Sequence, residues 1–75
     1  MYPPQYTNNN ISVTEREREI LQLLYEGLTS KQIGEKLFIS SRTVEDYRQR
    51  LMQKANTHNV VGLIRFGIQN GLIQI

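Results

Sequence analysis

The chain has 75 residues, of which 39% are hydrophobic and 21% charged, and its formal net charge is +2. A chain of this length supports one hydrophobic core, so we expect a single small domain. It has no cysteine, one histidine (His58) and one aspartate (Asp46), which excludes disulfides, thiolate metal sites and most catalytic constellations. We therefore expect no enzyme activity, no metal and no cofactor.

Basic residues are concentrated in the middle of the chain. Residues 29–58 carry six basic and three acidic side chains, whereas residues 14–28 carry two basic and four acidic ones. A local basic excess indicates where a polyanion would meet the protein.

The N-terminal residues differ in composition from the rest. Residues 1–10 contain two prolines and three asparagines but no apolar run, unlike a targeting signal. We expect residues 1–12 to form a flexible tail or linker and residues 13–75 to form the domain. No apolar stretch approaches the roughly 20 residues that cross a bilayer, so we expect a soluble, cytoplasmic protein without membrane contact.

A capping box predicts the first helix. Thr14 and Glu17 are spaced so that each side chain can bond the backbone amide of the other residue. Apolar residues follow at helical spacing, and Gly27 suits a left-handed C-terminal stop. The alternating Glu and Arg residues of this helix are expected to pair on its solvated face.

A second capping box, Thr29 with Gln32, predicts a short helix that ends near Leu37. Gly34 within it costs about 1 kcal/mol relative to alanine, so we expect another backbone to pack closely there. Residues 38–40 form a turn with two apolar side chains, Phe38 and Ile39, which predicts a turn anchored in the core.

Two further helices complete the domain. Ser40 can cap a third helix over residues 41–55, and Asn59 can cap a fourth that ends at Asn70, before Gly71 as a stop. No segment alternates with period two for long enough to predict a strand. The expected fold is all-α, a compact four-helix bundle that contains a helix-turn-helix.

The third helix carries the functional pattern. At 100° per residue, its core-facing side is expected to hold Val44, Tyr47, Leu51 and Ala55. Its opposite side holds Arg42, Glu45, Asp46, Gln49 and Gln53, flanked by Arg48, Arg50 and Lys54. Such a helix after a tight turn can enter the major groove of DNA, where polar side chains read base edges and basic ones contact phosphates.

A polar face is also common to any surface helix. Glu45 and Asp46 would repel phosphates and suit DNA only if they face bases such as cytosine. These two residues leave open an alternative function, a helical module that binds a protein partner with the same scaffold.

Several blocks of sequence resemble the LuxR/FixJ-type helix-turn-helix of bacterial transcription regulators. They are Thr14-x-Arg16-Glu17-x-x-Ile20-Leu21, Gly27-Leu28-Thr29-Ser30-Lys31-Gln32-Ile33, Leu37-Phe38-Ile39-Ser40 and Arg42-Thr43-Val44-Glu45, followed by Leu51, Lys54, Asn59, Leu63 and Asn70-Gly71-Leu72-Ile73. The resemblance implies that the third helix reads the major groove of double-stranded DNA and that the fourth mediates homodimerisation. It assigns Lys31, Arg42, Thr43, Tyr47 and Lys54 to the DNA backbone and Glu45, Asp46 and Gln49 to base edges; Arg50, which flanks the polar face, joins the backbone set.

Three positions depart from the commonest family pattern. Tyr47 replaces a frequent histidine and keeps a polar tip on a ring, whereas Glu45 stands where lysine is common, so no operator sequence can be transferred. Ala55-Asn56 replaces a typical leucine-glycine pair, which predicts looser packing at the end of the third helix.

The fourth helix has more apolar surface than one small core needs. Its apolar arc spans roughly 220°, about twice what docking requires. We expect Val61, Ile64 and Ile68, with Leu72 nearby, to form a dimer interface or to lie under a neighbouring domain; the other reading is that the small domain simply wraps this helix.

Regulation is not encoded within these residues. A phospho-receiver needs a cluster of acidic residues around an aspartate, which Asp46 alone does not supply. We expect the chain to be the output half of a two-component response regulator with an upstream receiver; the alternative is a free-standing regulator.

Overall fold

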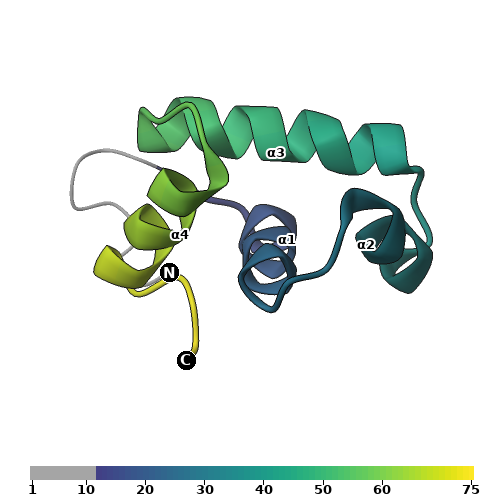
Figure 1. Cartoon of the computed structure of the whole chain (residues 1–75), viewed down its shortest axis with the longest axis horizontal. Helices are drawn as coiled ribbons and strands as arrows, with labels where there is room; N and C mark the ends of the chain where they lie inside the picture. Colours follow the sequence, from purple (N-terminus) through teal and green to yellow (C-terminus); the bar gives the residue numbers. More distant parts are fainter. Residues whose placement is uncertain (1–11) are drawn as a thin grey trace.

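The computed structural model describes residues 12–75, so the tail expected at residues 1–12 lies almost entirely outside the described part. Four helices follow one another through short connections (Figure 1). They are α1 (Glu15–Tyr25), α2 (Ser30–Leu37), α3 (Ser41–Ala55) and α4 (Val60–Gln69). Residues 12–75 contain no strand, so the expected all-α class is confirmed.

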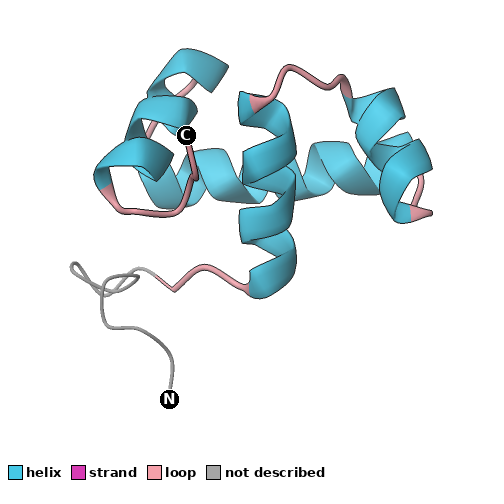
Figure 2. Cartoon of the chain, turned by 90° about the horizontal axis from the view of Figure 1, so that it is seen from below, coloured by secondary structure: helices cyan, strands magenta, loops and turns pink. Residues whose placement is uncertain are grey.

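The longest helix, α3, lies across the other three. Figure 1 shows α1, α2 and α4 on one side of α3, whose opposite side is uncovered along its length. Seen from below in Figure 2, α1 crosses α3 near its middle, with α2 and α4 to either side. The arrangement leaves one long helix face without a protein neighbour among the described residues.

The predicted N-caps are all formed. Thr14 and Glu17 make a reciprocal capping box at α1, and Thr29 and Gln32 make another at α2. The Ser40 hydroxyl accepts from the amide of Thr43, and the Asn59 side chain accepts from the amide of Gly62. The expected pairs on α1 are also present, Glu15 with Arg18 and Arg16 with Glu19.

Each helix ends on a residue in the left-handed backbone region. Gly27 and Gly71 were predicted to do so, with φ of 94° and 71°. Phe38 and Asn56 take the same position after α2 and α3, with φ of 61° and 54°. At each end the following amide bonds a carbonyl five residues back, as in Thr57 to Met52 at 3.0 Å. Asn56 therefore ends α3 at the position where glycine is typical of the LuxR/FixJ-type pattern, since asparagine tolerates the left-handed region.

The turn between α2 and α3 packs directly on Gly34. A Cβ at residue 34 would lie 2.6 Å from the carbonyl oxygen of Ile39, which confirms the expected close approach of another backbone. Ile39 packs against the core, but the Phe38 side chain is 93% exposed. The prediction that both side chains anchor the turn is therefore wrong for Phe38, because its left-handed backbone directs the ring into solvent.

The core combines residues from all four helices and from the chain's end. Its buried members are Ile20, Leu21, Leu23, Ile33, Val44, Leu51, Met52, Leu63, Leu72 and Ile73. Tyr47 and Ala55, expected to face the core, pack against it but are only partly buried. Met52 was not predicted to be buried; α4 and the loop before it cover a wider arc of α3 than the apolar pattern indicates.

The C-terminal segment closes the core. The side-chain amide of Gln22 donates to the carbonyl of Gln74 and accepts from its amide, at 3.0 and 2.8 Å. Leu72 and Ile73 are buried, and Ile73 lies where a Cβ on Gly67 would be. Leu72 is therefore a core residue, and its expected place beside an exposed patch on α4 is wrong.

Candidate nucleic-acid interface

The uncovered side of α3 presents a continuous row of exposed polar side chains. Arg42, Asp46, Gln49 and Gln53 follow one another at intervals of three or four residues and are all exposed. At 100° per residue they lie within about 60° of one another. This row, called the reading face below, is uncovered along α3 in Figure 1.

Two residues of the reading face pair with each other. Arg42 Nε lies 3.5 Å from Asp46 Oδ1, and both side chains remain mostly in solvent. An exposed pair of this kind contributes little to stability. The ion pair can therefore break at a small cost in free energy, which leaves both groups able to bind a ligand.

Glu45 is held more firmly than its neighbours. The Ser30 hydroxyl of α2 donates to Glu45 Oε2 at 2.5 Å, and Arg48 Nη1 lies 3.6 Å from the same oxygen. Glu45 is only half exposed. Among the three predicted base-reading residues, Asp46 and Gln49 thus face outward, whereas Glu45 bridges α2 and α3.

Two flanks border the reading face. The first flank holds Thr43, Tyr47, Arg50 and Lys54, and the second flank holds Glu45, Arg48 and Met52, at 100° per residue. On the first, the Arg50 guanidinium stacks 4.6 Å from the centre of the Tyr47 ring, and the Thr43 hydroxyl bonds that of Ser40. Lys31, next to Ser30 on α2, is exposed beside the second flank.

Lys54 differs from the other predicted backbone-contact residues because its charge is paired with a nearly buried carboxylate. Its ammonium group donates to Glu17 Oε1 and to the carbonyl of Ser12, both at 2.7 Å. The Glu17 side chain is only 5% exposed. The interaction ties the end of α3 to the start of α1, a role that the sequence pattern did not indicate.

The environment of Glu17 favours its charged form. Burial raises the pKa of this carboxyl, but the hydrogen bonds from Lys54 and from the Thr14 amide, with the nearby charges of Lys54 and Arg50, outweigh burial. The net pKa lies below the ordinary value of 4.5. Glu17 is therefore ionised near neutral pH, as the ion pair requires.

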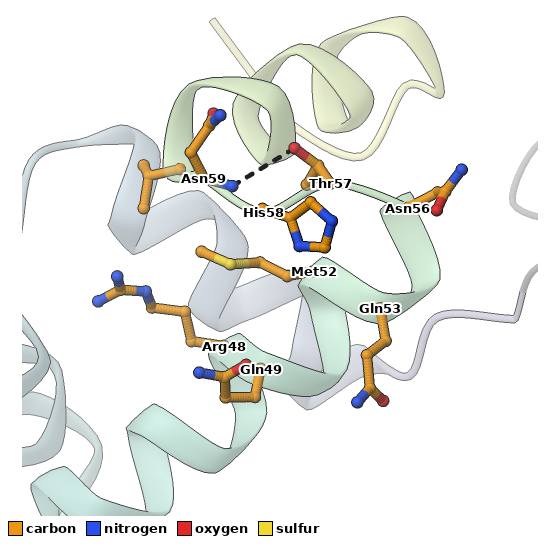
Figure 3. Close-up of a pocket in the computed structure, with 9 residues that line it drawn as sticks. Arg48, Gln49, Met52, Gln53, Asn56, Thr57, His58 and Asn59 are labelled. Carbon is orange, nitrogen blue, oxygen red and sulfur yellow. Dashed lines mark hydrogen bonds between the residues drawn. The ribbon is translucent and has the colours of Figure 1, made fainter.

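A concave pocket of about 640 Å³ adjoins the reading face at the C-terminal end of α3. It is lined by Arg48, Gln49, Met52, Gln53, Asn56, Thr57, His58, Asn59 and Val60. Figure 3 shows His58 above Met52, in the loop that leads to α4. Only the fold reveals that His58, carried by this loop, lines a pocket together with α3.

The predicted dimer residues differ in exposure. Val61 is 70% exposed and Ile68 42% exposed, whereas Ile64 is partly buried against the core. Val61 and Ile68 therefore leave apolar surface in solvent on the outer side of α4.

Comparison with known proteins identifies the class of protein. Residues 11–66 match the family described as bacterial regulatory proteins, luxR family. The chain belongs to this family, and it is a helix-turn-helix DNA-binding domain of transcriptional regulators, among them two-component response regulators. The family is not one of enzymes. Membership decides between the two functions left open by the sequence in favour of DNA binding.

Particular relatives agree with this assignment. The chain is 44% identical over 62 residues to a putative transcriptional regulator of Pseudomonas aeruginosa, covering 83% of this chain and 30% of that protein. It is 38% identical over 71 residues to the response regulatory protein YgeK of Escherichia coli, covering 95% of this chain and 48% of that protein. The chain thus spans between 30% and 48% of the length of these relatives.

A solved structure shares the fold. The response regulator ChrA of a heme-sensing two-component system superposes with a TM-score of 0.80 at 34% identity, over 89% of this chain and 33% of that one. No helix among residues 12–75 is long and apolar enough to cross a membrane.

Proposed function

We propose that this domain binds a specific DNA sequence by placing α3 in the major groove, with the reading face toward the base edges. The observation that carries the proposal is the uncovered row of Arg42, Asp46, Gln49 and Gln53 along α3. Glutamine and arginine side chains have well-matched partners on purine edges, and a carboxylate can accept from cytosine.

The residues around the reading face divide into two roles. Asp46 and Gln49 read bases, and Glu45 contributes to base reading where it can leave Ser30. The phosphate backbone is contacted by Thr43, Tyr47 and Arg50 on the first flank, by Lys31 at the start of α2, and by Arg42 at the N-terminal end of the reading face. We move Lys54 out of the backbone set into a structural role, because its ammonium is bonded to Glu17 and Ser12.

The domain is proposed to act as part of a larger assembly in the bacterial cytoplasm. Two copies would bind adjacent half-sites through Val61, Ile64 and Ile68 of α4, where Val61 and Ile68 expose apolar surface. An upstream receiver domain would control the binding. The length of the relatives and the description of two of them as response regulators support this arrangement.

Selection of bound DNA from a random duplex pool, at two salt concentrations, tests the proposal. An enriched motif with affinity that falls steeply as salt rises is the expected result, since phosphate contacts release counterions. Salt-sensitive binding without any enriched motif would contradict sequence reading by the isolated domain. Absence of binding at low salt would contradict the proposed function altogether.

Alanine variants test the division of roles. Gln49→Ala is expected to cost about 1–3 kcal/mol at one base pair and to relax the preference there. Arg50→Ala is expected to weaken binding to all sequences alike and to flatten the salt dependence. Titration of each variant against the selected duplex and against single-base variants separates the two effects. Identical profiles for both variants would show that the division is wrong.

A further inference from the structure

Most of the residues so far assigned to the DNA backbone lie on one side of α3. Thr43, Tyr47 and Arg50 lie on the first flank, whereas the second flank has only Lys31, beside its N-terminal half. A helix in the major groove lies between two sugar–phosphate strands, so both flanks face phosphates. The C-terminal half of the second flank therefore faces DNA without an assigned contact.

The pocket at the end of α3 occupies this place. It is lined by Met52 of the second flank and by Gln49 and Gln53 of the reading face. Any strand that follows the second flank past these glutamines meets the loop that carries Asn56 and His58 (Figure 3).

The pocket's chemistry suits an anion. None of its nine lining residues is acidic, and they offer a guanidinium, several side-chain amides, a hydroxyl and an imidazole. The other pocket described, between α1, α2 and the C-terminal segment, contains Glu15 and Glu19 and lies away from α3. The side chains of Asn56 and His58 are exposed and form no hydrogen bond within residues 12–75, whereas Arg48 is paired with Glu45.

We propose that this pocket receives a phosphodiester group of the DNA strand along the second flank, with His58 and Asn56 as its principal donors. The proposal rests on the proposed function, because it requires α3 to lie in the major groove. In this arrangement the loop between α3 and α4 is part of the DNA interface, and the two flanks of α3 contact different strands of the DNA duplex.

Two variants add a negative charge at the pocket while preserving the backbone. His58→Glu changes an exposed loop residue, and Asn56→Asp keeps a residue that tolerates the left-handed conformation. Gln69→Glu is the matched control, since it makes an exposed neutral side chain of α4 acidic near the opposite end of that helix from the pocket. Thermal unfolding of all three variants checks that the fold is retained.

Affinity for the selected duplex is measured for these variants by fluorescence anisotropy over a range of salt. Both pocket variants are expected to bind about three- to tenfold more weakly, because the introduced carboxylate repels the phosphodiester group and the neutral donor is lost. The control is expected to bind like the unmodified protein. Pocket variants that match the control would overturn the inference.

Neutral methylphosphonate linkages locate the contact on the DNA. One substitution on the strand along the second flank is expected to weaken binding of the unmodified protein but not of His58→Ala. If every substitution affects both proteins equally, no phosphate occupies the pocket. If Arg50→Ala weakens DNA binding but the His58 variants do not, the phosphate site in the pocket is refuted and the proposed function is not. If the unmodified protein binds no duplex at all, the proposed function is refuted as well.

Discussion

Phe38 combines a left-handed backbone with a side chain in solvent. A bulky residue in this region is strained by about 1–2 kcal/mol, and no burial compensates, since the ring is 93% exposed. The turn of the helix-turn-helix nevertheless requires the conformation, because the amides of Phe38 and Ile39 both donate to the carbonyl of Gly34.

Replacing Phe38 with asparagine is expected to stabilise the domain. Asn tolerates the left-handed region, so Phe38→Asn should raise the free energy of unfolding by about 1 kcal/mol. Urea unfolding measures the change. Phe38→Leu keeps an apolar side chain with the same backbone strain and should have little effect; equal stabilisation by both variants would show that ring exposure, not φ, is responsible.

The ion pair between Glu17 and Lys54 is the clearest case in which the structure gives a residue a different role from the one that the sequence pattern predicted. Lys54 matched a DNA-contact position in the family, but its ammonium bonds the nearly buried Glu17. Lys54→Ala should therefore lower the free energy of unfolding by about 1–3 kcal/mol, because it leaves a buried carboxylate without its partner.

The same pair gives stability a defined pH dependence. The pKa of Glu17 is lowered in the folded state, so its contribution is complete above the unfolded value of 4.5 and is lost as pH falls through the folded pKa. Unfolding measured from pH 7 to pH 3 should show a steeper loss for the unmodified protein than for Glu17→Gln. The pKa of exposed Glu15 is lowered by its hydrogen bond and ion pair with Arg18, so Glu15→Gln serves as the surface control and should retain most of the slope.

At the scale of the elements, the helices could be predicted closely because their signals are local. The capping residues Thr14, Thr29, Ser40 and Asn59 bond amides only three residues away, so short sequence patterns contain the whole interaction. The burial of Met52 depended on how the helices pack, and the exposure of Phe38 on the left-handed backbone of the turn. A single helical projection contains neither. The same limit applies to Lys54, whose partner is 37 residues away.

The contact between α2 and the following turn depends on the missing side chain of Gly34. Gly34→Ala places a Cβ 2.6 Å from a backbone oxygen and must displace the turn, so it should destabilise the domain by about 2 kcal/mol or more despite alanine's better helix propensity. Thermal unfolding measures this loss. Glu35→Ala, at the exposed neighbouring position, should leave stability within about 0.5 kcal/mol; a similar loss there would indicate a general sensitivity of α2.

At the scale of the whole molecule, the three shorter helices act as a support that leaves one side of α3 available. The polar pattern of α3 was sufficient to predict this side, and the family match confirms that the domain as a whole is a DNA-binding domain. The pocket next to it could not be predicted, because it joins residues of α3 with a loop and the start of α4 across a tertiary contact.

The outer surface of α4 allows a test of assembly. Val61→Glu places a charge on a residue that is 70% exposed, so stability of the single domain should change little. Binding to a duplex with two half-sites should lose cooperativity, with single-site affinity retained. Sedimentation of the protein–DNA complex counts the bound copies, with Gln69→Glu as the charge-matched control. If Val61→Glu still binds both half-sites cooperatively at the same protein concentration as the unmodified protein, this face of α4 is not the dimer contact.

The closure of the core by the last residues determines how short a functional piece of this protein can be. The family match ends at residue 66, before the stop of α4 and before Leu72 and Ile73, which fill the core between α1 and α4. An expressed fragment trimmed to that boundary would lack these side chains and the Gln22–Gln74 hydrogen bonds. Domain boundaries for expression, fusion or transplantation should therefore extend beyond the family match to include Leu72, Ile73 and Gln74.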